Sequence, residues 1–155
     1  MTQRDLLNAR FGNPVLNLAR FEAMNMKVWN CDDEFPELPF PRIYLNVYIL
    51  PYLRETFRLL KDSGLLGEIK TFDGCLNVRY IRGSTTQMSI HSWGLALDLN
   101  ASDNPLNMSR EQCIEKGLKP FTEAFIRIWR DTGWVCGADF GRKDLMHFQR
   151  TKEFV

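Results

Sequence analysis

This sequence of 155 residues has only two histidines, almost no excess of positive over negative charge, and no long apolar runs. The formal net charge of +1 gives no reason to expect nucleic acid or an anionic membrane as the main partner. No stretch approaches the roughly 18 consecutive apolar residues that a membrane-spanning helix needs. Repeats, low-complexity tracts and linkers are also missing. With 45% hydrophobic and 25% charged residues, the chain has the composition of one globular domain.

Cysteine spacing and the N-terminal residues give no sign of an oxidising compartment. The four cysteines, at positions 31, 75, 113 and 136, follow neither a zinc-ribbon nor a C-x-x-C spacing. Residues 1–11 lack the apolar core of a secretory signal and predict a short helix capped by Thr2. We therefore expect free thiols in a monomeric chain made in the cytoplasm without a signal peptide. Such a protein would reach an external target only after release by another factor.

Residues 89–100, SIHSWGLALDLN, are the most informative stretch. From Gly94 onward, small or polar residues alternate with leucines, and this period of two predicts a half-buried strand. Asp98 then faces away from the leucine core. Because Gly94 and Ala96 carry no bulky side chain on the same face, a metal ion or another backbone can approach closely there. His91 lies just before the strand, where it can converge with Asp98.

The only other histidine, His147, lies near the C-terminus. Catalytic zinc usually takes three protein side chains and leaves a fourth position open, and His91, Asp98 and His147 would complete such a set. Asp144, three residues before His147, would then be free to act as the base that activates water. Residue type alone leaves two alternatives. Each residue is also typical of an ordinary structural hydrogen bond, and two histidines with one carboxylate also occur in non-haem iron sites.

Two motifs carry a resemblance to a known family: Ser89-x-His91-x-x-Gly94-x-Ala96-x-Asp98, and Gly137-Ala138-Asp139-Phe140 followed by Asp144-x-x-His147-Phe148-Gln149. They resemble the zinc peptidases that include D-alanyl-D-alanine carboxypeptidases and L-alanyl-D-glutamate endopeptidases, most closely the phage endolysin branch. The likeness is clear from about Thr71 to Gln149. Three features depart from the pattern. Met146 stands where proline is common, Gly137-Ala138 stands in place of a glycine pair, and Asp144 stands where other branches place glutamate.

The resemblance implies a role for each site residue. His91, Asp98 and His147 would bind one catalytic zinc ion, and Asp144 would be the general base. The implied fold is the DD-peptidase/hedgehog-like zinc peptidase fold, an α+β domain with a small, mainly antiparallel sheet and helices packed against it. Residues 1–155 would form a single catalytic domain without a separate cell-wall-binding module.

Four further residues are candidates for the site. Arg82, in a segment that resembles the arginine-bearing segment of the family, is expected to hold a substrate carboxylate or the developing oxyanion. Arg79 is a second candidate for the same role, and either arginine could instead be a solvated residue at a strand end. Ser89 would orient the substrate or a ligand, or only cap a turn. Asp139 competes with Asp144 as the base, but its place beside a glycine favours a turn.

The order of the expected elements also indicates an α+β fold. Pro51 and Gly64 fit the start and end of one helix, and Ser109-x-x-Gln112 is a capping box that opens another. A second long helix is expected over 121–131, with Ala124, Phe125, Ile128 and Trp129 on one apolar stripe. Residues 68–73 and 76–81 are expected to form a hairpin joined at Asp73-Gly74, and 134–136 and 145–148 to form strands. The proline-rich segment 32–42 predicts a loop, which could be a surface crossing or could border a substrate groove.

Three functions fit these observations. The first is an L-alanyl-D-glutamate endopeptidase that degrades bacterial peptidoglycan stem peptides as a phage endolysin. The second is a D-alanyl-D-alanine carboxypeptidase that remodels the wall, with the same chemistry at a different bond. The third is a non-catalytic binding domain with a structural zinc ion. A carboxylate at Asp144 argues against the third, as does the lack of a fourth protein ligand near the motif.

Overall fold

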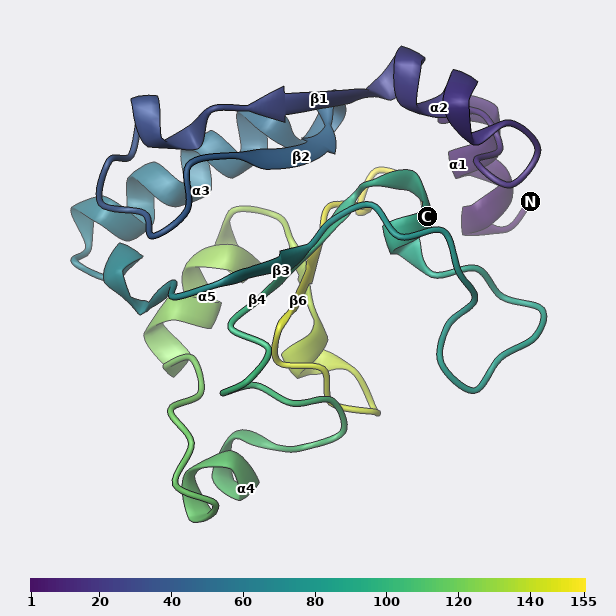
Figure 1. Cartoon of the computed structure of the whole chain (residues 1–155). Helices are drawn as coiled ribbons and strands as arrows, with labels where there is room; N and C mark the ends of the chain where they lie inside the picture. Colours follow the sequence, from purple (N-terminus) through teal and green to yellow (C-terminus); the bar gives the residue numbers. More distant parts are fainter.

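The computed structural model describes residues 1–155 and has an α+β architecture (Figure 1). Its helices are α1 (Gln3–Phe11), α2 (Leu18–Asn25), α3 (Leu50–Asp62), α4 (Arg110–Glu115) and α5 (Glu123–Asp131). Its strands are β1 (Met26–Trp29), β2 (Ile43–Asn46), β3 (Phe72–Gly74), β4 (Ala96–Leu99), β5 (Val135–Cys136) and β6 (His147–Gln149). None of the helices is long and apolar enough to cross a membrane. The α+β fold predicted from the sequence is confirmed.

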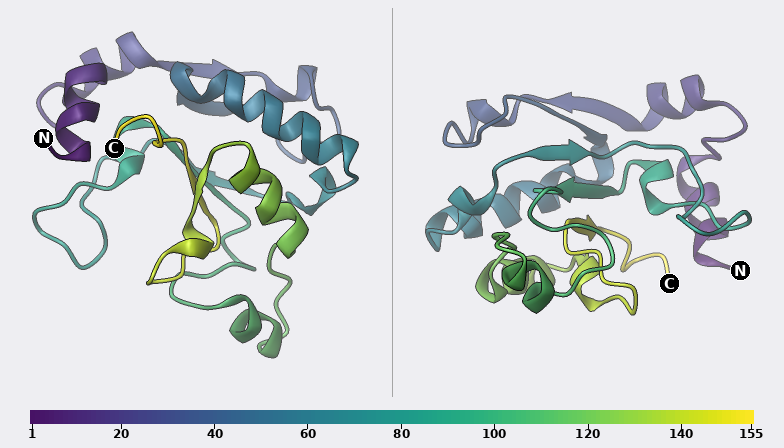
Figure 2. Two further views of the ribbon diagram at one scale, coloured as in Figure 1. Left: turned by 180° about the vertical axis from the view of Figure 1, so that it is seen from behind. Right: turned by 60° about the horizontal axis from the view of Figure 1, so that its bottom comes forward.

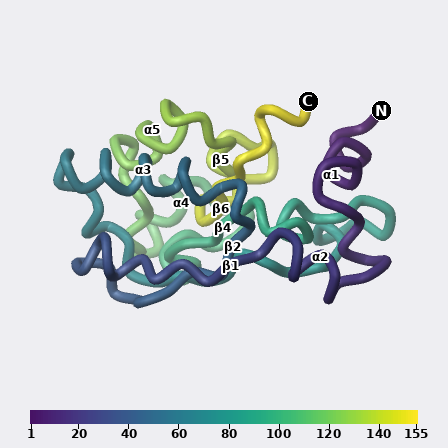
Figure 3. The backbone as a smooth tube through the Cα atoms, turned by 90° about the horizontal axis from the view of Figure 1, so that it is seen from above, coloured from purple at the N-terminus to yellow at the C-terminus, as the bar shows by residue number.

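All strand pairs are antiparallel. The first two strands form a separate two-stranded sheet, and the others form a four-stranded sheet in the order β3-β4-β6-β5. Seen from behind, α3 and α5 lie side by side (Figure 2), and the two helices are in contact. The view from above places α1 and α2 together at the opposite end of the molecule from α3 and α5 (Figure 3).

The two central strands divide their side chains between the hydrophobic core and the open face of the sheet. Leu97 and Phe148 are fully or almost fully buried, and Phe148 stacks on Trp129 of α5 with 4.3 Å between ring centroids. Side chains alternate along a strand, so Asp98 and His147 lie on the face away from α5. Helix α5 therefore packs against one face of the sheet, and the candidate ligands lie on the other face.

Helix boundaries follow the capping residues. The predicted caps at Thr2 and Ser109 are confirmed, and both form capping boxes. The cap hydroxyl accepts from the backbone N–H of the third helical residue, and the side chain of that residue, Asp5 or Gln112, accepts from the backbone N–H of the cap. The last helix begins later than expected, because Thr122 caps it. The prediction that Ala124 lies on the apolar stripe of this helix is wrong: Ala124 is exposed, and Ile126 is buried there instead.

The predicted hairpin at Asp73-Gly74 is wrong. Those two residues lie inside β3, and Gly74 pairs with Asp98 of β4. Contacts distant in sequence override the local turn signal. The Asn100 side chain accepts from the backbone N–H groups of Lys70 and Thr71, and Asp73 accepts from the N–H of residue 101. The segment 76–81 contains only an isolated bridge and is otherwise irregular.

Trp129→Ala should destabilise the protein by about 3–5 kcal/mol, because it removes the ring that fills the space between α5 and the sheet. The indole is fully buried and contacts the rings of Phe57, Phe148 and Trp134. Equilibrium unfolding in denaturant measures the loss. Leu16→Ala is the control, since Leu16 is 83% exposed and its replacement should change the free energy of unfolding by less than about 0.5 kcal/mol. Equal losses in the two variants would contradict this description of the core.

Candidate metal centre

A short 3-10 helix, Ile90–Trp93, positions His91. The Ser89 hydroxyl caps it by accepting from the backbone N–H of His91, and Gly94 ends it with a φ of 66°. Glycine is favoured there for two reasons. Residues that carry a side chain rarely adopt this left-handed backbone conformation, and a Cβ on Gly94 would lie 2.6 Å from the sulfur of Met26.

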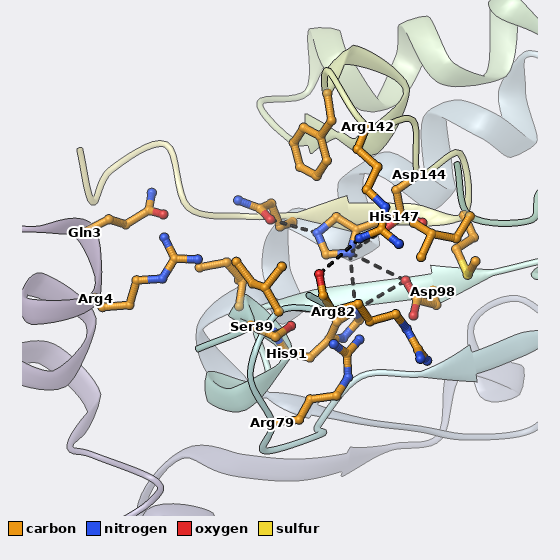
Figure 4. A pocket seen from close by; sticks show the side chains of 16 residues that line it. Gln3, Arg4, Arg79, Arg82, Ser89, His91, Asp98, Arg142, Asp144 and His147 are labelled. Atoms are coloured by element: carbon orange, nitrogen blue, oxygen red, sulfur yellow. Dashed lines mark hydrogen bonds and ion pairs between the residues drawn. The ribbon is translucent and has the colours of Figure 1, made fainter. Parts of the chain in front are cut away.

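Strand pairing positions the other two candidate ligands. Asp98 and His147 are register partners across β4 and β6, so their side chains leave the same face of the sheet directly opposite each other. The His91 Nε2 atom lies 3.3 Å from Asp98 Oδ1 and 3.2 Å from His147 Nδ1. The third distance, from His147 Nδ1 to Asp98 Oδ1, is 3.5 Å. The structure thus brings together the three residues predicted to bind zinc (Figure 4).

Hydrogen bonds on the outer side of each imidazole assign its tautomer. His91 Nδ1 lies 2.8 Å from the carbonyl oxygen of Cys75, and His147 Nε2 lies 2.7 Å from Oε1 of Gln149. Each of these nitrogens must donate, because its partner oxygen can only accept. In the neutral rings, the lone pairs of His91 Nε2 and His147 Nδ1 therefore face each other and Asp98. Partners of this kind orient histidines that bind metals.

The donor set fits a zinc ion. Asp98 Oδ1 is buried and has no hydrogen-bond partner, which is costly for an oxygen that carries charge. Burial raises the pKa of Asp98, but the imidazoles of His147 and His91 outweigh burial and hold the pKa below its usual value, so the group is a carboxylate. A cation among the three atoms would satisfy the oxygen and both lone pairs. Two imidazoles, one carboxylate and an open position are typical of catalytic zinc.

Asp144 lies at the edge of this cluster. Its Oδ2 atom is 3.9 Å from His147 Nδ1, and its Oδ1 atom is buried without a hydrogen-bond partner. Burial raises the pKa of Asp144 above its usual value. The turn before it depends on Gly137, whose carbonyl accepts from the Asp144 N–H and whose missing Cβ would otherwise collide with the Asp144 carbonyl oxygen.

Asp139, the competing candidate for the base, points elsewhere. Its two carboxylate oxygens accept from Arg130 at 2.8 and 3.0 Å, and both side chains are exposed. The carboxylate does not line the cavity that contains the cluster. Of the two aspartates considered, the structure brings only Asp144 to the candidate ligands.

A cavity of about 670 Å³ opens over the cluster, and the candidates Arg79, Arg82 and Ser89 all line it. Figure 4 shows Arg79 and Arg142 approaching the cluster from opposite walls. The guanidinium of Arg142 donates to the carbonyl oxygen of Arg82 at 3.0 Å and joins the two walls. The proline-rich loop 32–42, for which a surface crossing and a border of the groove were both open, contributes nothing to the lining of this cavity.

Three residues of the site had not been singled out from the sequence. Gln149 holds His147, and the periodicity of a strand gives a usable signal for it, because residue 149 shares a face with residue 147. Arg142 and Arg4 also line the cavity. No local pattern marks either arginine, since each reaches the cavity through contacts with residues far away in the sequence.

Gln149→Leu should weaken zinc binding by about 10–100-fold, because it removes the acceptor that orients the His147 ring. Competition with a chromophoric chelator measures the affinity. Asp139→Asn is the matched control, as its side chain lies outside the cavity and should leave the affinity unchanged. Unchanged affinity in Gln149→Leu would show that the hydrogen bond to Gln149 does not support the site.

Comparison with known proteins agrees with this chemistry. Residues 82–150 match the family model described as D-alanyl-D-alanine carboxypeptidase. No curated protein and no solved structure matches the chain. The matched segment contains all three candidate ligands and Asp144. Peptidases of this family depend on zinc, and the cluster of His91, Asp98 and His147 can hold it. The match covers less than half of the chain, and over that segment it supports a likeness to the zinc peptidase family.

Proposed function

We propose that this protein is a zinc-dependent L-alanyl-D-glutamate endopeptidase that cuts peptidoglycan stem peptides as a phage endolysin. The observation that carries the proposal is the convergence of two oriented imidazoles and an unpartnered carboxylate oxygen at the floor of a cavity. The family match supports a zinc peptidase that acts on peptidoglycan. Asp144, beside the cluster, supplies a carboxylate with no other partner at its buried oxygen.

His91, Asp98 and His147 would hold the metal ion in this proposal. Zinc bound there would polarise the scissile carbonyl and lower the pKa of water to about 7. Asp144 accepts a proton from the attacking water and passes it to the leaving amine. A base works best with a pKa close to the operating pH, and burial moves the pKa of Asp144 in that direction.

Arg79 and Arg82 hold negative charge on the substrate. Arg82 is exposed, whereas Arg79 is half-buried and its Nε atom is buried without a hydrogen-bond partner. Arg79 is also close enough to lower the pKa of Asp144 and thus partly offsets burial. We therefore assign Arg79 to the oxyanion and Arg82 to a substrate carboxylate. Ser89 fixes the turn that carries His91.

A D-alanyl-D-alanine carboxypeptidase is the second candidate, and the description of the matched family favours it. The two enzymes would use the same residues and differ in the bond that enters the site. The endopeptidase is preferred because the cavity continues from the cluster to Arg4 on α1, and so leaves room for several substrate residues beyond the bond that is cut. A non-catalytic zinc domain is the third candidate, and it would leave Asp144 without a role.

The proposal includes synthesis in the host cytoplasm and action on the wall after release by another factor. The four cysteines support this route. All are free and buried, and burial raises the pKa of Cys75 and Cys136 to about 12. Unreactive buried thiols without disulfides are typical of a reducing compartment.

Incubation of the purified protein with purified peptidoglycan, with zinc or after chelation, tests the function. Mass analysis should show new amino termini on D-glutamate that appear only with metal. Release of free D-alanine would replace the endopeptidase by the carboxypeptidase. Intact walls of several chemotypes, with metal shown to be bound, would contradict both enzymes and leave the binding domain.

Asp144→Asn should lower kcat on peptidoglycan by at least about 100-fold, because the amide cannot accept the proton from water. Zinc content should stay the same, since the three ligands are untouched. Asp139→Asn serves as the control and should keep full activity. If Asp144→Asn digests walls at the normal rate with zinc bound, another group is the base.

A further inference from the structure

Four arginines line the cavity, and none has a carboxylate partner in the protein. Arg4, Arg79, Arg82 and Arg142 all border the space over the metal centre, and none lies within 4.0 Å of a carboxylate oxygen. Three arginines elsewhere in the chain do form such pairs, at 2.8 to 3.0 Å: Arg54 with Glu34, Arg130 with Asp139 and Arg150 with Glu153. What distinguishes the cavity is that four guanidinium groups without a carboxylate partner border one space.

The charge of the cavity favours an anionic ligand. Its only acidic lining residues are Asp98 and Asp144, the candidate metal ligand and the candidate base. Four arginines outnumber these two carboxylates, and a bound zinc ion would add further positive charge. Like charges that face one cavity repel each other, and an anion that enters it relieves the repulsion. The cavity can therefore take more than one carboxylate.

The arginines occupy two parts of the cavity. Figure 4 shows Arg79, Arg82 and Arg142 around the cluster, whereas Arg4 approaches from α1 at some distance from it. Arg4 Nε donates to the carbonyl oxygen of Met88 at 3.1 Å, which fixes the guanidinium plane. Its two terminal nitrogens have no partner in the protein and remain available for a bidentate contact with a carboxylate.

We propose that Arg4 is a specificity-determining residue that binds a second substrate carboxylate, one remote from the scissile bond. The inference rests on the proposed function and deepens it, because it defines the substrate as an acidic peptide with two separated carboxylates. The stem peptide L-alanyl-γ-D-glutamyl-L-lysyl-D-alanyl-D-alanine has this chemistry, with one carboxylate on the glutamyl residue and one at the C-terminus. When the bond before D-glutamate is cut, the C-terminal carboxylate is the remote one. Arg4 belongs to α1, which lies outside the segment 82–150 that matches the family.

If Arg4 had only a structural role, its replacement would weaken the binding of every substrate equally. The hydrogen bond to Met88 also ties α1 to the 81–88 loop, so loss of the side chain could disturb the cavity in general. Arg4→Gln separates the two roles, since glutamine keeps an N–H donor near that carbonyl and removes the charge. Arg20→Gln is the matched control, because Arg20 is exposed on α2 and does not line the cavity.

The experiment measures binding and cleavage separately. Calorimetry on the zinc-loaded Asp144→Asn protein gives the Kd of the pentapeptide, of its C-terminal amide and of its glutamyl amide. The same titrations are repeated with Arg4→Gln or Arg20→Gln added. Hydrolysis of the three peptides by the wild-type, Arg4→Gln and Arg20→Gln enzymes gives kcat and KM.

Loss of one charged contact should weaken binding by about tenfold or more. We expect the C-terminal amide to bind at least tenfold more weakly than the free acid, and Arg4→Gln to abolish that difference by raising KM at unchanged kcat. Arg20→Gln should preserve the difference. Equal weakening of all three peptides by Arg4→Gln, or no weakening, would overturn the inference. Binding that follows the expected pattern without cleavage by the wild-type enzyme would overturn the proposed function and leave the anion subsite standing.

Discussion

The antiparallel pairing of β4 with β6 is the constraint on which the site depends. It places Asp98 directly opposite His147, although the two residues are far apart in the sequence. The same register sends Leu97 and Phe148 into the core, where Phe148 stacks on Trp129. A slip of one residue would exchange the two faces, so that apolar side chains leave the core and the candidate ligands of that strand turn toward it. Core packing and metal geometry therefore stabilise the same register, and this is why so small a sheet can hold a well-defined site.

Electrostatics within the cluster explains why the pairing favours a metal ion. Outer hydrogen bonds to the Cys75 carbonyl and to Gln149 turn the lone pairs of both imidazoles inward, toward an Asp98 oxygen that has no donor. When both rings are neutral and no cation is bound, this arrangement brings three acceptors together and lowers the stability of the fold. The chain maintains it through packing elsewhere. Local strain or unsatisfied polar groups maintained in this way are typical of functional sites.

Local sequence patterns predicted the parts of the site that depend on local geometry. The alternation after Gly94 predicted the face of Asp98, and the scarcity of histidine together with the motif pointed to His91 and His147. Sequence patterns did not predict the structure of segments whose conformation depends on contacts with residues far away in the sequence. Asp73-Gly74 has the composition of a hairpin turn, but the side chain of Asn100 and the backbone of β4 draw this segment into the sheet. Arg4 was not anticipated, because it reaches the cavity only after α1 docks against residue 88, which is 84 positions away.

X-ray absorption spectroscopy at the zinc edge, on protein loaded with one equivalent of zinc, tests whether the three residues form the metal centre. We expect a four-coordinate ion with two imidazole nitrogens and two oxygens at about 2.0–2.2 Å, and loss of one imidazole in His147→Ala. Sulfur ligation, or the same spectrum after His147→Ala, would place the metal elsewhere and contradict the assignment of His91, Asp98 and His147 as the metal centre.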